Sequence, residues 1–185
     1  MRPIPILFLI HLLIFSCTQK TETKEATLDS GIDQSLQGKE TTPPLTGGMI
    51  ENGDSMLLPP FEIEVTLSDL AKEKLNADKE TIIVNAYVSG EPKDSIDIQI
   101  NEMGLLNLAA NEIELDKPGV AKFDKITISR KAYEALANKD FEILINIYSG
   151  RRSSEYNLLN AEILQEPLSA VAGKRHVLNA KLIKE

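Results

Sequence analysis

From Phe61 onward, apolar and polar residues alternate along most of the chain. In the stretch 61–67, Phe, Ile, Val and Leu occupy one face of an extended chain, and Glu and Thr occupy the other. This period of two is typical of a strand with one buried face. Similar runs recur towards the C-terminus. The eight predicted strands are 61–67, 81–88, 96–100, 105–115, 120–128, 141–148, 158–164 and 176–183.

The runs differ in the character of their second face. Residues 96–100 (Ile-Asp-Ile-Gln-Ile) show the cleanest alternation, whereas ETIIVNAYV (80–88) and FEILINIY (141–148) are apolar on both faces, which indicates central strands. Glycine and proline turns separate the runs. Seven to eight short strands at this spacing predict a mainly-β protein, an antiparallel β-sandwich of the immunoglobulin-like or transthyretin-like kind.

Two segments of the chain, 65–87 and 126–148, match without gaps at an offset of 61 residues. Each copy predicts a strand, a helical turn and a strand, with Ser68 or Ser129 placed to cap the helix N-terminus. The match favours a pseudo-symmetric sandwich with two short helical crossovers. Generic convergence on strand–helix–strand is one alternative, and an α+β fold with one covered sheet face is another. Identical pairs include Thr66/Thr127, Ser68/Ser129, Ala71/Ala132, Glu73/Glu134, Leu75/Leu136, Asn85/Asn146 and Tyr87/Tyr148.

The first sixteen residues form a different kind of segment. A basic Arg2 is followed by the nearly continuous apolar run 4–15, which spans only about 18 Å as a helix and is too short to cross a bilayer. These features predict a cleaved export signal, residues 1–16.

The end of this signal, Ile14-Phe15-Ser16-Cys17, resembles the lipobox of bacterial lipoproteins, with an aliphatic residue at −3, a small residue at −1 and then cysteine. The resemblance covers the signal alone. It implies cleavage before Cys17, acylation of that cysteine with palmitate-type chains, and anchoring in a membrane of the bacterial cell envelope. Thr18, where enterobacterial lipoproteins retained in the inner membrane carry Asp, favours the outer membrane and exposure to the periplasm.

Residues 17–60 are predicted to be a tether. This segment is rich in Thr, Glu, Lys, Gly and Ser and has no aromatic residue, so it cannot bury enough apolar surface to fold alone. As a random coil it would span about 35–40 Å. The small apolar cluster at 49–58 makes the boundary with the domain at 61–185 a soft one.

Charge and cysteine content narrow the possible partners. The chain has 20 Lys and Arg against 28 Asp and Glu, a net charge of −8. Nucleic acids and anionic lipid surfaces select basic clusters, so we expect neither to be a partner of the domain. Cys17 is the single cysteine, so no disulfide can form within the chain.

No motif in the sequence predicts catalysis. It has no H-E-x-x-H, no paired cysteines, no G-x-S-x-G and no glycine-rich phosphate loop. His176 is the only histidine after the signal, and its basic neighbours Lys174 and Arg175 indicate a solvated turn residue. We therefore predict a protein that is not an enzyme and uses no cofactor or metal.

One loop is a candidate for recognition. After the second repeat copy, two adjacent arginines stand out in an acidic chain, and Arg, Ser and Tyr side chains suit recognition of carboxylates, phosphates or protein backbone. A solvated hairpin loop is the alternative. The candidate residues are Arg151, Arg152, Ser153, Ser154 and Tyr156.

Together these features predict a lipid-anchored envelope protein whose sandwich binds a protein or another envelope component. An accessory structural lipoprotein is a second hypothesis, acting by β-augmentation through 162–170 or the final strand. A ligand carrier is a third, although the chain has no Trp and few aromatic residues for stacking on sugars.

Overall fold

The computed structural model describes residues 48–94 and 98–184. The predicted signal, Cys17 and the predicted tether up to residue 47 lie outside these residues. The helices are α1 (Asp69–Asp78), α2 (Arg130–Ala135) and α3 (Leu168–Val171). The strands are β1 (Ile50–Asn52), β2 (Ser55–Leu57), β3 (Phe61–Leu67), β4 (Ile82–Gly90), β5 (Leu106–Leu115), β6 (Gly119–Phe123), β7 (Thr127–Ser129), β8 (Glu142–Ser149), β9 (Leu159–Ala161), β10 (Leu164–Pro167) and β11 (Arg175–Leu182).

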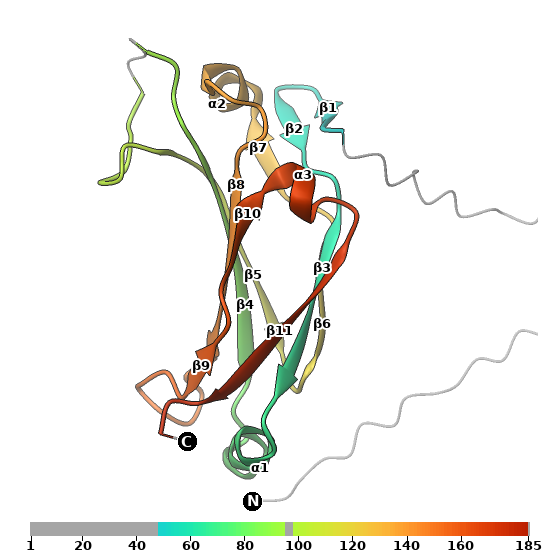
Figure 1. Ribbon diagram of the computed structural model, residues 1–185, viewed down its shortest axis with the longest axis vertical. Coiled ribbons are helices and arrows are strands. Elements are labelled where there is room, and N and C mark those ends of the chain that lie inside the picture. The colour runs from blue at the N-terminus through green and yellow to red at the C-terminus, as the bar shows by residue number, and fades with distance from the viewer. Residues whose placement is uncertain (1–47, 95–97, 185) are drawn as a thin grey trace, which may run out of the picture. The chain divides into compact units, whose positions relative to one another are not determined.

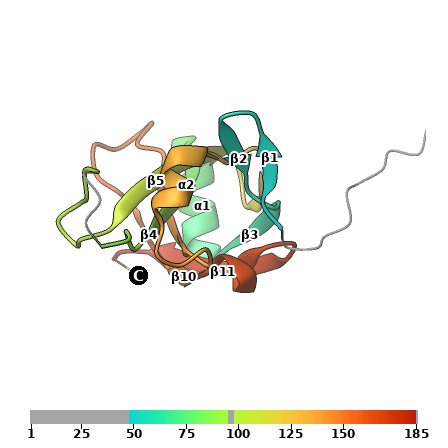
Figure 2. The same ribbon diagram turned by 90° about the horizontal axis from the view of Figure 1, so that it is seen from above.

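Two four-stranded sheets pack face to face, as Figures 1 and 2 show. The first has the order β10-β8-β4-β5 and is antiparallel throughout, and the second has the order β6-β3-β11-β9. Within the second sheet β11 runs parallel to β3. A small sheet, β1-β2-β7, lies at the end of the sandwich near α2. The predicted mainly-β sandwich is confirmed, with one parallel pair added.

The core forms where the inward positions of the two sheets meet. Ile63 and Val65 of β3 face Val84 of β4 and Ile143 and Ile145 of β8, and all five are almost fully buried. Burying each such side chain contributes about 1.5–3 kcal/mol. Strands β4 and β8 are the two inner strands of their sheet, as their doubly apolar sequences predicted. The core also contains the stacked rings of Phe61 and Phe123, whose centroids are 5.0 Å apart.

The repeat segments form the same strand–helix–strand unit twice. The Ser68 hydroxyl accepts a hydrogen bond from the Ala71 N–H at 3.2 Å, and the Ser129 hydroxyl accepts one from the Ala132 N–H at 3.1 Å. Each cap satisfies an N–H group of the first helical turn. Helices α1 and α2 lie at opposite ends of the sandwich, and each links the first sheet to a different sheet (Figure 1).

The second strands of the two copies, β4 and β8, are hydrogen-bonded neighbours. Asn85 lies opposite its own counterpart, Asn146. On either side of this pair, Tyr87 lies opposite Leu144 and Ile83 lies opposite Tyr148, so residues 61 positions apart exchange places. A local two-fold axis therefore passes through the Asn85–Asn146 pair, at the centre of the first sheet.

The predicted strand 96–100 is wrong for residues 98–100, which form no strand; residues 95–97 lie outside the described residues. This segment belongs to the connection between β4 and β5. The Asn101 side chain accepts hydrogen bonds from the N–H groups of Met103 and Leu105, which turns the chain back towards β5. Because β4 already has β5 and β8 as neighbours, no edge of β4 is open to a further strand.

Two predicted strands are each divided between sheets. Residues 120–128 contain β6 of the second sheet and β7 of the small sheet, and residues 158–164 contain β9 of the second sheet and the start of β10 of the first. Alternation identifies the buried side of a strand but not the sheet that the strand joins. In both segments one side stays buried as the chain passes from one sheet to another, so the alternation does not reveal the change of sheet.

The edges and the start of the domain also differ from expectation. The final strand, β11, lies between β3 and β9, and β9 pairs with it at residues 180–182 alone, so the edge predicted for β-augmentation is covered over that part of the strand. Strand β10, within 162–170, does lie at an edge. The folded chain begins before Phe61, since β1 and β2 form a hairpin on β7 and bury Met56.

Candidate functional site

The predicted recognition loop leaves the first sheet through a close contact with the start of β4. The Gly150 N–H donates to the Thr81 carbonyl at 2.9 Å. A Cβ on residue 150 would lie 1.9 Å from Thr81 Oγ1, so only glycine permits this approach. The loop is therefore held against the strand where it begins.

Glu80 holds the next part of the loop. Its carboxylate accepts hydrogen bonds from the backbone N–H groups of Thr81, Arg152 and Ser153 at 2.8–3.0 Å, and from the Ser153 hydroxyl at 2.7 Å. Glu80 is 3% exposed. Burial by itself raises the pKa of Glu80, but these hydrogen bonds outweigh it and lower the pKa to about 2. The ionised carboxylate therefore takes the place of water as the hydrogen-bond acceptor for the backbone N–H groups of the loop.

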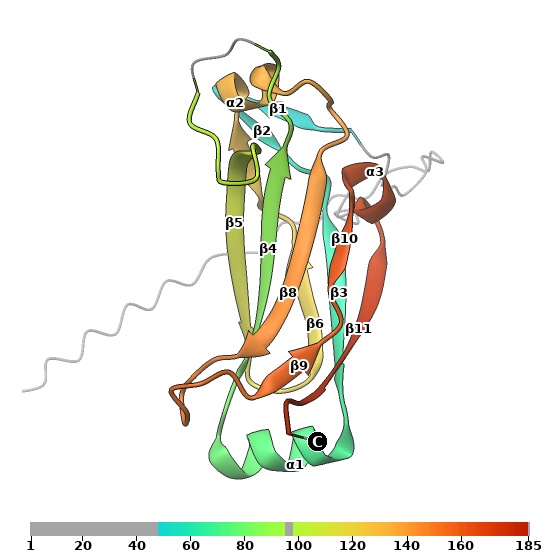
Figure 3. The same cartoon turned by 60° about the vertical axis from the view of Figure 1, so that its left-hand side comes forward.

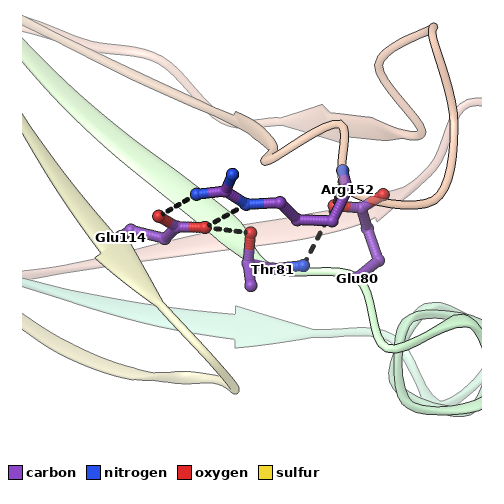
Figure 4. A network of polar contacts seen from close by, with 4 residues as sticks. All are labelled: Glu80, Thr81, Glu114 and Arg152. Carbon is purple, nitrogen blue, oxygen red and sulfur yellow. Dashed lines mark hydrogen bonds and ion pairs between the residues drawn. The ribbon is translucent and has the colours of Figure 1, made fainter.

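Arg152 is engaged by a second carboxylate. Its Nε and Nη2 donate to the two oxygens of Glu114 at 2.9 and 2.6 Å, and Thr81 Oγ1 donates to the same carboxylate at 2.7 Å (Figure 4). The hydrogen bond from Arg152 is the main reason that the pKa of Glu114 is lowered. This two-pronged pairing fixes both the position and the direction of the guanidinium.

The five predicted recognition residues are therefore used in different ways. Arg152 and Ser153 are brought together around Glu80 and are used within the chain. Ser154 accepts a hydrogen bond from the Tyr156 N–H. Arg151, with φ of 58°, and Tyr156, which is 77% exposed, project from the fixed loop.

Beside this loop lies a surface that the sequence analysis did not identify. It is the solvent side of the first sheet, which we call the tyrosine face; Figure 3 shows the sheet from this side, with no described helix across β4 and β8. Its positions follow from the register of the four strands, because directly paired residues share a face. The main residues of the tyrosine face are Ile83, Asn85, Tyr87, Ala110, Glu112, Glu114, Glu142, Leu144, Asn146 and Tyr148.

A hydrogen-bonded group occupies the middle of the tyrosine face. Asn85 Nδ2 donates to Glu112 Oε1 at 2.6 Å, and the Tyr148 hydroxyl donates to the same oxygen. The hydrogen bond from Tyr148 is the main reason that the pKa of Glu112 is lowered, and the bond from Asn85 lowers it further. Burial is the main reason that the pKa of Tyr148 is raised, and its hydrogen bond to Glu112 raises it further. Asn85 is 2% exposed although it is on the outer side, and its Oδ1 has no hydrogen-bond partner in the structure.

The repeat contained a signal for this surface. Asn85/Asn146 and Tyr87/Tyr148 are identical pairs, and all four lie on the solvent side, where packing against the core does not dictate the residue. Other identical pairs have a structural explanation: Ser68 and Ser129 cap helices, and Leu75 and Leu136 are buried.

His176 does not lie in a solvated turn, and that prediction is wrong. It is a half-buried residue of β11, paired in register with Ile63, and its Nε2 is buried without a hydrogen-bond partner. Within residues 48–94 and 98–184, no three His, Cys, Asp or Glu side chains are grouped closely enough to bind a metal ion.

Two shallow hollows lie away from the tyrosine face. One, of about 360 Å³, runs between α1 and the turn joining β5 to β6, and the other, of about 460 Å³, lies over the ends of β3, β9 and β11.

None of the described helices has the length and apolar character needed to span a bilayer.

Comparison of the chain with protein-family models, curated proteins and solved structures finds no match.

Proposed function

We propose that this chain is a lipid-anchored protein of the bacterial cell envelope, attached through Cys17, and that it binds another envelope protein through the tyrosine face without catalysing a reaction. The lipobox-like end of the signal supports the anchor, and the composition of 17–60 supports a flexible connection to the membrane. Thr18 after the cysteine favours the outer membrane, with the domain in the periplasm.

The observation that carries the binding proposal is the tyrosine face itself. Tyr87 is 42% exposed on the central strand β4, and partly exposed Ile83, Leu144 and Tyr148 surround the asparagine pair. Tyrosine supplies a large apolar surface with a polar end at little cost in side-chain entropy, which suits protein interfaces. The fixed loop carrying Arg151 and Tyr156 borders this surface at the Glu114–Arg152 pair.

A photo-crosslinking amino acid tests the position of the interface. Placed at Tyr87 in the full chain in its native envelope, it should give one discrete protein adduct. Placed at Val177, an exposed residue on the outer side of the second sheet, it should give none. Adducts of equal yield from both positions, or from position 177 alone, would contradict the proposal.

The anchor needs a separate test. Labelled palmitate should enter the wild-type protein and not a Cys17→Ala variant. Equal labelling of the two would remove the lipid anchor from the proposal and leave the tyrosine face to be judged by crosslinking.

β-Augmentation is the second candidate function, and the edge strand β5 favours it. Among the described strands it is the longest, with ten residues, and it pairs with β4 alone. A partner strand would add main-chain hydrogen bonds along β5. Binding of this kind would slow hydrogen exchange of β5 amides and would survive replacement of Tyr87 by Ala, whereas binding by the tyrosine face would not.

A further inference from the structure

The charge of the tyrosine face indicates the chemistry of its partner, and this inference rests on the proposed function. Glu112 accepts both of its hydrogen bonds at Oε1, and within the described residues no donor reaches Oε2. The carboxylate is therefore held in one orientation, with Oε2 free of hydrogen bonds from the described residues.

No cation of the described chain neutralises this carboxylate. Of the three acids at strand positions of the tyrosine face, Glu114 is paired with Arg152, and Glu142 accepts a hydrogen bond from Gln165. Glu112 is in no ion pair with a described residue. The four described strands place neither Lys nor Arg on this face.

The surroundings of Glu112 suit a long basic side chain. Tyr148 donates to it directly, and Tyr87 lies one position further along the same face, opposite Ala110. Tyrosine rings attract ammonium and guanidinium groups and also cover their methylene stems. Asn85 Oδ1 is buried beside Glu112 and accepts no hydrogen bond from a described residue.

We infer that the tyrosine face binds a segment of a partner protein that carries arginine or lysine, with Glu112 as its ionic anchor and the tyrosines as its aromatic support. The charge is complementary, because a face with three carboxylates and no strand-borne cation in an acidic chain attracts a basic segment.

The test uses a short acetylated peptide with two arginines separated by glycine, and a matched peptide with citrulline, which keeps the shape and loses the charge. Added to the full chain in detergent at physiological salt, the arginine peptide should saturably shift the NMR signals of Tyr87, Tyr148 and the amides around Glu112. The citrulline peptide should bind at least about fivefold more weakly.

Two variants of equal charge separate specific from general attraction. Glu112→Gln should weaken binding of the arginine peptide about fivefold, whereas Glu73→Gln, on the exposed side of α1, should change it less than about twofold. Ala110→Lys provides a second variant that leaves Glu112 intact and places a resident cation beside it, and it should also weaken binding.

Several outcomes would overturn the inference. Equal effects of Glu112→Gln and Glu73→Gln would show only general attraction to an acidic protein, and equal binding of the citrulline peptide would show that charge is not recognised. A crosslinked partner at Tyr87 that is insensitive to Glu112→Gln, whether a neutral protein or a second copy of this chain, would leave the proposed function standing and remove the basic segment. If the crosslinker at position 87 gives no protein adduct even when Glu112 is unchanged, the proposed function itself is removed.

Discussion

The outer sides of the two four-stranded sheets differ in whether their acidic side chains are paired with basic ones. On the second sheet, the outer side has three acids (Glu62, Glu64, Glu162) and three bases (Lys122, Arg175, Lys181). We call it the ion-paired face, since Arg175 bonds Glu62 at 2.6 Å and lies 3.8 Å from Glu64, and Lys122 lies 3.6 Å from Glu62. The tyrosine face has three acids and no base on its strands.

This difference lies at positions that the core of the sandwich does not dictate. Both sheets bury aliphatic residues at the inward positions, so the core requires apolar side chains from each sheet alike. The outward positions are free to vary. On one face the chain's own basic residues pair with its acids, whereas on the other Glu112 forms no ion pair with a described residue.

Of the substitutions that compare the two faces, removal of the Glu80 carboxylate should change the free energy of unfolding most. Glu80→Ala leaves three backbone N–H groups at the border of the tyrosine face without their acceptor, and we expect the free energy of unfolding to fall by about 4 kcal/mol. Urea denaturation measures the change, with the exposed Glu73→Ala as the control. A loss below about 1 kcal/mol would contradict a structural role for Glu80.

Acid should weaken the hydrogen bonds between the Glu80 carboxylate and the loop. The pKa of Glu80 is about 2 in the folded protein against an ordinary 4.5, so its contribution is complete above pH 4.5 and is lost as the pH falls from about 4.5 to about 2. The shift corresponds to about 3 kcal/mol. Denaturation at a series of pH values should show this loss in the wild type and not in a Glu80→Gln variant; parallel curves would contradict the assignment.

Replacing Asn85 should have the opposite sign. Asn85→Val removes a buried oxygen that has no partner, and it places a β-branched residue in a central strand, so we expect a gain of about 1 kcal/mol together with weaker partner binding. Asn146→Val, at the half-buried counterpart, should gain less. Destabilisation by Asn85→Val would indicate that its bond to Glu112 matters more than its unpaired oxygen.

The smallest effect is expected on the ion-paired face. Arg175→Gln removes two exposed ion pairs, which together contribute no more than about 0.5 kcal/mol. Thermal unfolding at low and high salt would measure this change. A loss above about 2 kcal/mol would show that the ion-paired face also stabilises the fold.

Much of the fold could be predicted because local rules agree with it. The alternation in 61–67 and the doubly apolar segments that became β4 and β8 identified the core strands, and the two serines identified the helix caps. Partners and edges could not be predicted, because a period of two does not state which sheet a strand joins. Residues 96–100 alternate perfectly, yet 98–100 form no strand because a strand also needs a free neighbour.

The candidate site was less predictable for the same reason. The adjacent arginines drew attention to the loop, but the acceptor of the Arg152 and Ser153 N–H groups, Glu80, lies more than seventy residues earlier in the chain. The hydrogen bond between Asn85 and Glu112 depends on the pairing of β4 with β5. Only the repeated Asn and Tyr marked the tyrosine face in the sequence.

The two-fold axis at the Asn85–Asn146 pair has a consequence for orientation. A ligand seated over that axis would meet a tyrosine, an asparagine and an aliphatic side chain again after a half-turn, so the centre of the face alone would accept it either way round. The flanks differ: Glu112 of β5 lies beside Asn85, whereas the flank beyond Asn146 has Ile163, which precedes β10 and is 65% exposed. If the tyrosine face binds a partner as proposed, an acid on one flank and an isoleucine on the other would favour a single orientation of that partner.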